Sequence, residues 1–547
     1  METTASREHG ATALLVSLLA LGVVAALFVL RGFDDNRLTS WSWIFAGTHP
    51  LALFGLASAA IGLAHVLARF PLQRAGVLFV FSYAAAACLW SEPEAIIDAS
   101  RYFTQAKHLE LHGAGYFFAQ WGKEIPAWTD LPLVPFLYGM VFRLFGESRT
   151  CVQAVTTLLF TGTVVLTWRL GKLLWNEETG FAGGALLLAI PYLLTQVPAF
   201  LADVPTMFFF TLAVWATAVA CQRGGVARIL LASAAIVLAA LSKYSTWILL
   251  SVLPVVWLVF RRPRAGLAAF AISGSLVLAL LALRADVFSA QVALLAGYQA
   301  PGLRRWGESF VSTFFFQIHP FLTLAALVSL VLAVRHRDWR TAVVAWPVLL
   351  LFVMQIQRIR YLIPVFPMLA LMAARGLQAI RARQVRATVV TSAVFSSLAI
   401  AGFGYLPFLR STSAANLMAA GAYLDSLDEP RVEVLTSSQP DAEINEAVDV
   451  PLLDLYTSRK LIYRDKARPP PPGVEQSALR FTWDYRNPAY YGPEDGPAAL
   501  VVISDRPAQP PPRGNYHLLR VFASDERVFT HTTVVSVYRR EPKGGDI

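Results

Sequence analysis

Residues 75–102 read AGVLFVFSYAAAACLWSEPEAIIDASRY, an apolar run without a charged side chain that leads into a polar segment containing Asp98. A second isolated carboxylate, Asp203, lies between two later apolar runs, in the sequence Ala202-Asp203-Val204-Pro205. Burying a carboxylate in apolar surroundings is costly unless partners or water compensate its charge. If both acids reach the same face of an apolar bundle, they mark a polar site there.

The composition defines the class of protein. Of the 547 residues, 56% are hydrophobic and only 15% are charged, and the mean hydropathy is +0.52. Apolar runs of about 17–22 residues recur along the first three quarters of the chain, and each could cross a bilayer as a helix. The sequence therefore predicts a polytopic α-helical membrane protein. The expected spans, about thirteen in number, are 11–31, 50–69, 75–90, 151–172, 180–197, 205–221, 226–242, 246–260, 265–283, 320–334, 341–357, 361–378 and 387–407.

The basic residues predict the orientation. They fall on alternate connections: Arg69 and Arg74, Arg169 and Lys172, Arg223 and Arg228, and the segments 261–264, 335–340 and 375–386. Because basic loops stay in the cytoplasm, we expect a cytoplasmic N-terminus and, after an odd number of spans, an extracytoplasmic C-terminus. The net charge of +10 is then explained by topology, and nucleic acid is not expected as a partner.

The chain is expected to have three parts. Residues 1–74 add two N-terminal helices, 75–409 form the membrane core, and 410–547 form an outer α/β domain. In this domain a helix is predicted at 413–427 and strands at 432–435, 500–504, 518–522 and 534–538. The core has two long outer loops, 91–150 and 284–319. The apolar segment 131–142 carries two prolines and is too short to cross, so an interfacial or re-entrant helix is expected.

Residues 98–107, DASRYFTQAK, are similar to the start of the first outer loop of GT-C glycosyltransferases. The resemblance is closest to the protein O-mannosyltransferase and lipid A aminoarabinose transferase superfamily, whose loop reads Asp-Glu-x-Arg-Tyr-x-x-x-Ala-Arg. Ala99 replaces the family's Glu. Three later motifs match in order: Pro132-Leu133 followed by Leu144-Phe145-Gly146, then Asp203-Val204-Pro205-Thr206, then Arg358-Ile359-Arg360-Tyr361-Leu362-Ile363-Pro364. The resemblance spans about residues 75–410.

The resemblance implies a GT-C fold and an inverting glycosyltransferase. Such enzymes move a sugar from a polyprenyl-phosphate carrier to a hydroxyl or phosphate of an acceptor at the outer membrane face. The expected location is the bacterial cytoplasmic membrane, with the active site on the periplasmic side. The expected partners are a lipid-linked sugar donor, membrane lipids and an acceptor that is a glycan, a lipid or a protein.

The same resemblance implies the roles of the site residues. Asp98 is expected to be the base on the acceptor side, and Asp203 to orient the acceptor or a nearby cation. Each acid could instead be a helix N-cap. The residues expected to bind the substrate and its phosphate are Arg101, Tyr102, Lys243, Arg304, Arg305, Arg358, Arg360 and Tyr361. For Lys243, Arg304 and Arg305, snorkelling to lipid headgroups is an alternative.

One departure from the family leaves an alternative open. Relatives carry a lysine just before the Pro-Pro-Leu segment that faces the carrier phosphate, whereas this chain has Thr129-Asp130-Leu131-Pro132. A divalent cation held by Asp130, with Glu92, Glu94 or His319 as a fellow ligand, could supply the missing positive charge, although no spacing is diagnostic of such a site.

Two other functions compete with the glycosyltransferase. A transporter or lipid flippase would place ionisable residues near the bilayer midplane, whereas the acids here lie at one rim. A non-catalytic envelope assembly protein would depend on its outer domain and not on Asp98.

Overall fold

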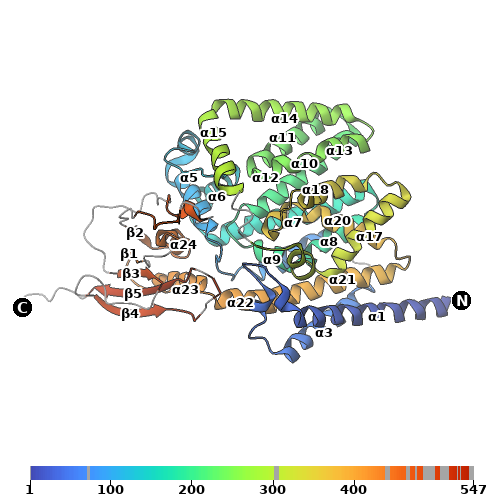
Figure 1. Cartoon of the computed structure of the whole chain (residues 1–547), viewed down its shortest axis with the longest axis horizontal. Helices are drawn as coiled ribbons and strands as arrows, with labels where there is room; N and C mark the ends of the chain where they lie inside the picture. Colours follow the sequence, from blue (N-terminus) through green and yellow to red (C-terminus); the bar gives the residue numbers. More distant parts are fainter. Residues whose placement is uncertain are drawn as a thin grey trace, which may run out of the picture.

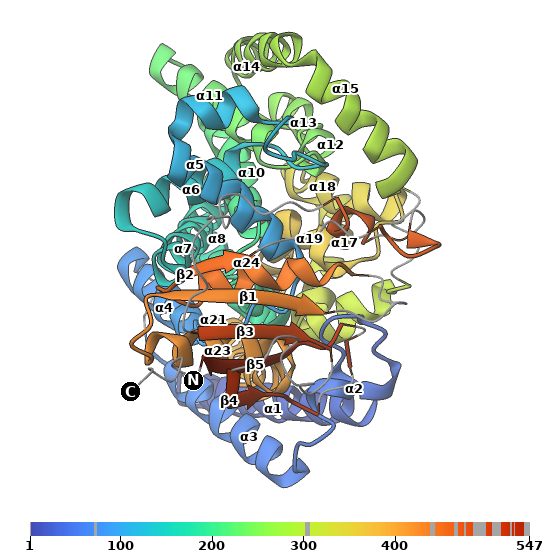
Figure 2. The same cartoon turned by 90° about the vertical axis from the view of Figure 1, so that its left-hand side faces the viewer.

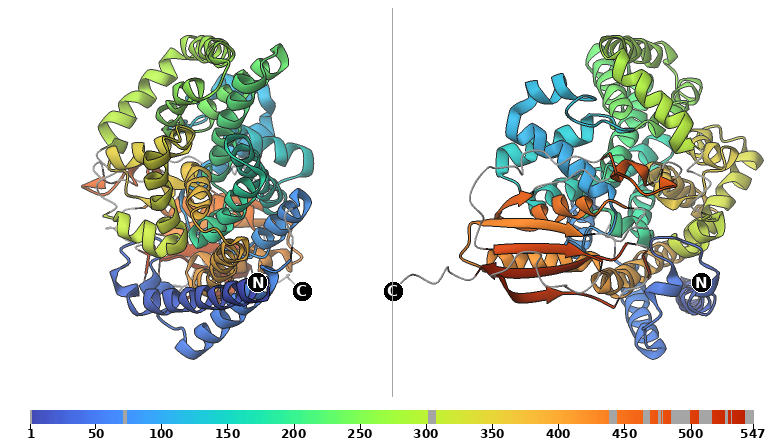
Figure 3. Two further views of the ribbon diagram at one scale, coloured as in Figure 1. Left: turned by 90° about the vertical axis from the view of Figure 1, so that its right-hand side faces the viewer. Right: turned by 60° about the vertical axis from the view of Figure 1, so that its left-hand side comes forward.

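The computed structural model describes residues 2–70, 74–300, 307–437, 444–463, 469–474, 477, 479–484, 499–505, 516–525, 528–529 and 531–540. Its helices form a bundle along the long axis of the molecule, and a five-stranded sheet covers one end (Figure 1). The N-terminus lies at the end of the molecule opposite the sheet (Figure 1). The left panel of Figure 3 shows this N-terminal end facing the viewer.

Within the described residues, seven helices are long and apolar enough to cross a membrane. Five are regular: α1 (Glu2–Val29), α3 (Pro50–Leu67), α7 (Arg149–Leu174), α10 (Asp203–Arg223) and α14 (Pro263–Leu283). Two are composite: α19 (Ile359–Leu362), η6 (Ile363–Val365) and α20 (Phe366–Leu377), then α21 (Arg383–Ile400), η7 (Ala401–Tyr405) and α22 (Leu406–Ser411). Each of the seven matches a predicted span.

Most other predicted spans are shorter apolar helices: α4 (Ala75–Ala87), α11 (Val226–Ser242), α12 (Ser245–Leu249) with α13 (Val252–Val259), α17 (Pro320–His336) and α18 (Thr341–Val353). The exception is the span predicted at 180–197. It is broken into α8 (Glu177–Leu186), η2 (Leu187–Ala189) and α9 (Pro191–Gln196). Pro191 lacks a backbone N–H and forces Ile190 before it into an extended conformation, so a continuous helix cannot form there.

Three of the basic connections meet at the same end of the bundle. Asp338, after α17, accepts a hydrogen bond from Trp175 Nε1 at 3.0 Å and pairs with Arg375 Nη2 at 2.9 Å. Arg386 pairs with Glu178 at 2.7 Å. These contacts join the connections that follow α7, α17 and α20, as the alternating pattern of basic loops requires.

The bundle has a buried centre and an apolar exterior. In the span formed by α19 and α20, 89% of the apolar stretch is buried inside the protein, whereas in α14 the buried share is 17%. A methyl group added to Gly376 of α20 would lie 1.8 Å from the Ala325 carbonyl oxygen of α17, so these two backbones touch. Leu278 on α14 and Val334 on α17 are exposed, as expected for side chains that face lipid.

The C-terminal sheet has the strand order β2 (Lys460–Tyr463), β1 (Arg431–Ser437), β3 (Ala499–Ser504), β5 (Val534–Arg540) and β4 (Tyr516–Phe522). The first three strands are parallel and the last two antiparallel to their neighbours. The four predicted strands are present, together with the predicted helix as α23 (Ala414–Asp425). Strand β2 was not predicted, because its four residues are too few to show an alternation of apolar and polar side chains.

The sheet domain packs on the first long outer loop. This loop contains α5 (Asp98–Gln120) and α6 (Leu133–Phe145), beside the sheet in Figure 2. The second outer loop contains α15 (Ala285–Leu294), η3 (Leu295–Gln299) and η5 (Ser312–Gln317). Phe103 and Phe142 of the first loop share one apolar core with sheet residues such as Val434 and Val501. Lys107 of α5 also pairs with Glu147 at 3.0 Å and with Asp454 of α24 (Asp449–Leu455).

We predict that the sheet domain is extracytoplasmic and the N-terminus cytoplasmic. In a variant whose native cysteines Cys88, Cys151 and Cys221 are replaced, a cysteine at Ser437 should react with a membrane-impermeant maleimide in intact cells. A cysteine at Ser6 should react only after permeabilisation. Labelling at Ser6 and not at Ser437 in intact cells would reverse the orientation.

Candidate active site

The two acids that were singled out in the sequence begin two helices. Asp98 is the first residue of α5 and Asp203 the first residue of α10, and the N-cap positions belong to Ile97 and Ala202. Neither side chain serves as the N-cap that was considered as an alternative. Both carboxylates instead bind the same arginine.

Arg360, on α19, joins the two acids. Its Nη1 lies 2.5 Å from Asp98 Oδ2 and its Nε lies 2.8 Å from Asp203 Oδ2. Lys243, at the end of α11, places Nζ 2.5 Å from the other oxygen of Asp203. Residues from four separate segments thus meet at the end of the bundle that faces the sheet.

Arg101 lies on the other side of Asp98. Its Nη1 is 3.5 Å from Asp98 Oδ1, and its Nε is 2.6 Å from Asp130 Oδ2. Tyr102 and Gln105 also donate hydrogen bonds to the Asp130 carboxylate, each at 3.3 Å. Asp130 is therefore the anchor that orients Arg101 beside Asp98.

The charges around Asp98 keep it ionised. Burial alone raises the pKa of its carboxyl, but Arg360 and Arg101 outweigh burial and hold that pKa below its usual value. Asp130 behaves differently, because burial raises its pKa more than Arg101 lowers it. The lowered pKa keeps Asp98 an anion throughout the neutral range.

The four predicted metal ligands do not meet. Glu94 pairs with Arg149 at 2.9 Å and accepts a hydrogen bond from the Phe200 backbone, and Glu92 is buried. His319 Nδ1 accepts the Phe321 backbone N–H at 3.1 Å and so caps α17. In the described ranges no three His, Cys, Asp or Glu side chains are grouped as a metal site would require.

Asp130 also does not fit a metal ion, because Arg101 already compensates its charge. The prediction that these four residues share a metal ion is therefore corrected. Asp130 orients Arg101, and Glu92 is a buried acid. Glu94 binds Arg149 and the Phe200 backbone, and His319 caps α17.

Arg358 and Tyr361 complete the arginine motif. The Arg358 guanidinium lies 3.4 Å from the Tyr361 hydroxyl and 3.9 Å from Glu308, which also accepts the Ile359 backbone N–H. The remaining predicted phosphate-binding residues, Arg304 and Arg305, lie outside the described residues.

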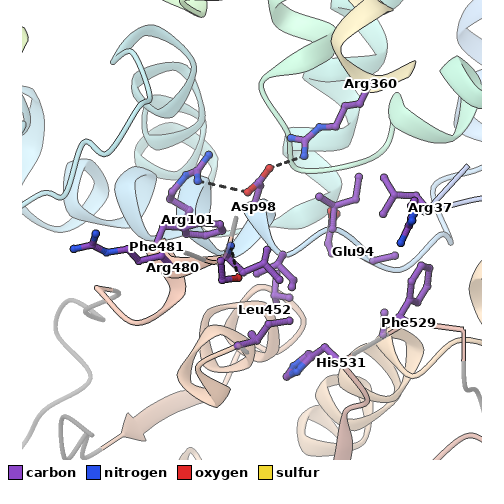
Figure 4. Close-up of a pocket in the computed structure, with 18 of the residues that line it drawn as sticks. Arg37, Glu94, Asp98, Arg101, Arg360, Leu452, Arg480, Phe481, Phe529 and His531 are labelled. Carbon is purple, nitrogen blue, oxygen red and sulfur yellow. Dashed lines mark hydrogen bonds and ion pairs between the residues drawn. The ribbon is translucent and has the colours of Figure 1, made fainter. Parts of the chain in front are cut away.

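A cavity of about 810 Å³ lies over this cluster. The core contributes Asp98, Arg101 and Arg360 to its lining, as Figure 4 shows. The N-terminal part contributes residues such as Arg37, and the sheet domain contributes residues such as Arg480. The cavity is large enough for a sugar-sized ligand.

Several lining residues were not predicted from the sequence. Phe481, in η10 (Arg480–Thr482), places its ring 4.7 Å from the Arg101 guanidinium carbon. Arg37, Trp43, Asp449 and His531 also line the cavity. They belong to no motif, and only the packing of the N-terminal and C-terminal parts brings them to it.

Known proteins resemble this chain in part of its sequence and in its fold. Residues 129–285 match the family described as dolichyl-phosphate-mannose-protein mannosyltransferase. No curated protein matches the chain by sequence. ArnT from Cupriavidus metallidurans in the apo state has the same fold, with a TM-score of 0.50, 12% identity, and coverage of 84% of this chain and 97% of that chain.

Two further solved structures resemble the chain more distantly. ArnT bound to undecaprenyl phosphate gives a TM-score of 0.48 at 12% identity, covering 84% of this chain and 97% of that chain. The oligosaccharyltransferase AglB from Archaeoglobus fulgidus, in complex with an inhibitory peptide and a dolichol phosphate, gives 0.46 at 11% identity, covering 79% and 69%.

The fold and the family match define the class as a membrane protein with a GT-C fold. The match over residues 129–285 and the fold shared with ArnT together support a GT-C glycosyltransferase of the protein mannosyltransferase and ArnT superfamily. The resemblance read from the sequence motifs is thus confirmed. The matched segment 129–285 includes Asp130, Asp203 and Lys243, whereas Asp98 and Arg360 lie outside it.

We predict that Asp130→Asn destabilises the protein. Removing the carboxylate leaves the buried Arg101 without its main partner, and breaking a buried pair costs on the order of 3 kcal/mol. The Tm in detergent should fall, whereas Asp286→Asn, at an exposed ion pair of α15, should leave it unchanged. If EDTA lowered the Tm of the wild type but not the Tm of Asp130→Asn, Asp130 would instead be a metal ligand.

Proposed function

We propose that this enzyme transfers a sugar from a polyprenyl-phosphate donor to an acceptor hydroxyl at the outer face of the membrane, with inversion at the anomeric carbon. The family description, which names a dolichyl-phosphate-mannose donor, supports the class of donor. The observation that carries the proposal is the Asp98 carboxylate, held between Arg360 and Arg101 in a cavity of sugar size.

The reaction needs a base and a positive charge at separate points. The acceptor oxygen forms a bond to the anomeric carbon while the bond from that carbon to the phosphate oxygen breaks, and the electron pair stays on the carrier phosphate. The acceptor proton passes to Asp98. The developing negative charge on the phosphate is stabilised by the nearby guanidinium groups.

The pairing of Asp98 suggests how its basicity is controlled. A carboxylate with a depressed pKa is a weak base, because proton transfer is most efficient when the pKa lies near the working pH. A carrier phosphate entering the cavity would compete for Arg360 and Arg101. As these cations turn toward the phosphate, the pKa of Asp98 rises, so that donor binding prepares the base.

The arginines are the better candidates for binding the carrier phosphate. A guanidinium can bind two phosphate oxygens at once. Arg358 and Arg360 both line the cavity, whereas the residues proposed for a cation do not gather in the described parts of the chain.

Asp98→Asn should abolish transfer, because the amide cannot accept the acceptor proton. Loss of a general base lowers the rate by about 10²–10⁴-fold. The assay is release of carrier phosphate from defined undecaprenyl-phosphate sugars by purified protein. Asp425→Asn, at an exposed site of the sheet domain, is the matched control. Near-normal turnover in Asp98→Asn would remove Asp98 from the mechanism.

Arg358→Ala should weaken binding of undecaprenyl phosphate by about 10–100-fold, the range expected for one lost charged hydrogen bond. Arg360→Lys, which keeps a cation between the two acids, should fold and yet transfer more slowly. Arg228→Ala, in the exposed first turn of α11, is the control. Full activity in both variants, together with complete loss in EDTA and recovery with divalent ions, would favour a metal ion over the arginines.

A further inference from the structure

The wall of the cavity formed by the sheet domain carries a His–Asp pair. His531 Nε2 lies 2.9 Å from Asp449 Oδ2, and Thr533 Oγ1 donates a hydrogen bond to the same oxygen at 3.2 Å. Asp449 starts α24, and His531 precedes β5. All three residues line the cavity that contains Asp98.

The surroundings of His531 favour a fixed, ionised pair. Burial lowers the pKa of His531, but the Asp449 carboxylate outweighs burial and, with Asp505 and Glu446, raises that pKa above its usual value. The His531 side chain keeps 20% of its surface exposed, against 6% for Asp449. The imidazole is therefore the more exposed member of the pair, and the carboxylate, which also lines the cavity, orients it.

Two aromatic rings flank this pair. Trp43, in α2 (Trp41–Ile44), meets Phe529 edge to face at a centroid distance of 6.4 Å, and both rings line the cavity while staying half-buried. In Figure 4, Phe529 and His531 lie on the opposite side of Asp98 from Arg360. The N-terminal part and the sheet domain together build this wall.

Trp43 is held in place by an anchored segment. Asp34, which precedes α2, accepts hydrogen bonds from Ser312 Oγ at 2.5 Å, from Gln317 Nε2 at 2.6 Å and from the Trp41 backbone N–H at 2.9 Å. The segment that carries Trp43 is thereby fixed to the core, so Trp43 presents a preorganised surface to the cavity.

We propose that Asp449, His531, Trp43 and Phe529 form the acceptor subsite, and that the acceptor is a carbohydrate. This inference rests on the proposed glycosyl transfer. Arg360 and Arg101 flank Asp98 and serve the donor phosphate. The acceptor must therefore reach Asp98 from a side that neither arginine occupies, and this wall offers groups that match a sugar.

The chemistry of the wall favours a sugar over a phosphate or a peptide. A carboxylate that accepts and an imidazole that donates can bind neighbouring hydroxyls of one ring. Aromatic rings pack against the apolar face of a sugar with little loss of conformational entropy. His531 already pairs with Asp449, so it offers a phosphate no uncompensated positive charge.

The test measures acceptor and donor separately in the full-length protein. The donors are a panel of undecaprenyl-phosphate hexoses, and the acceptor probes are p-nitrophenyl glycosides, their 6-phosphates and a serine-containing peptide. Hydrolysis of the donor by water reports the donor site alone. In His531→Ala, Asp449→Asn and Phe529→Ala, the KM for the neutral glycoside should rise about tenfold, equivalent to one net hydrogen bond or aromatic contact.

In the same variants, the rate of donor hydrolysis and the Kd for undecaprenyl phosphate should stay within about twofold of the wild-type values, because no contact with the donor is lost. His517→Ala, on β4 and exposed, is the matched control and should change neither quantity. An unchanged KM in correctly folded variants would overturn the subsite. Preference of the wild type for the peptide or for the 6-phosphates would overturn the carbohydrate assignment.

Failure of the proposed function itself gives a different result. In that case the wild type releases no carrier phosphate from any donor of the panel, with or without an acceptor, and the inference about the subsite falls with it.

Discussion

The Arg360 guanidinium between Asp98 and Asp203 is the contact on which the site depends. A buried guanidinium is costly unless carboxylates compensate it, and buried carboxylates need a cation in return. Arg360 is 4% exposed and binds both acids. Because the acids begin α5 and α10, this contact also fixes where the first long outer loop meets the bundle.

A second set of contacts brings the sheet domain to this point. Lys107 of α5 binds Asp454 of α24, and Phe481 of the sheet domain covers Arg101. The same helix therefore carries Asp98 at its start and the anchor for the sheet domain further along. In this arrangement the sheet domain is part of the cavity wall and not a separate appendage.

Three of the predicted metal ligands do not gather, because each of these three already has a structural partner. In the sequence, Asp130, Glu94 and His319 were isolated polar residues without visible partners. In the structure, Arg101, Arg149 and the Phe321 backbone occupy them. A short-range pattern cannot show Arg101 and Arg149, which lie 29 and 55 residues away from the acids that they bind, whereas the cap formed by His319 is local.

The sequence by itself determined the membrane class, the positions of most helices and the resemblance to the GT-C glycosyltransferases, and it singled out Asp98, Asp203 and Arg360, which meet in the structure. These depend on local signals: apolar run length, alternating basic loops and short motifs. Only the tertiary structure decided that the span around Pro191 is broken, that both acids share one arginine, and that Trp43, Asp449 and His531 line the same cavity as Asp98. The reason is physical, since a cavity wall is made by the packing of distant segments, and no periodicity within any one of them encodes which side chains will face each other across it.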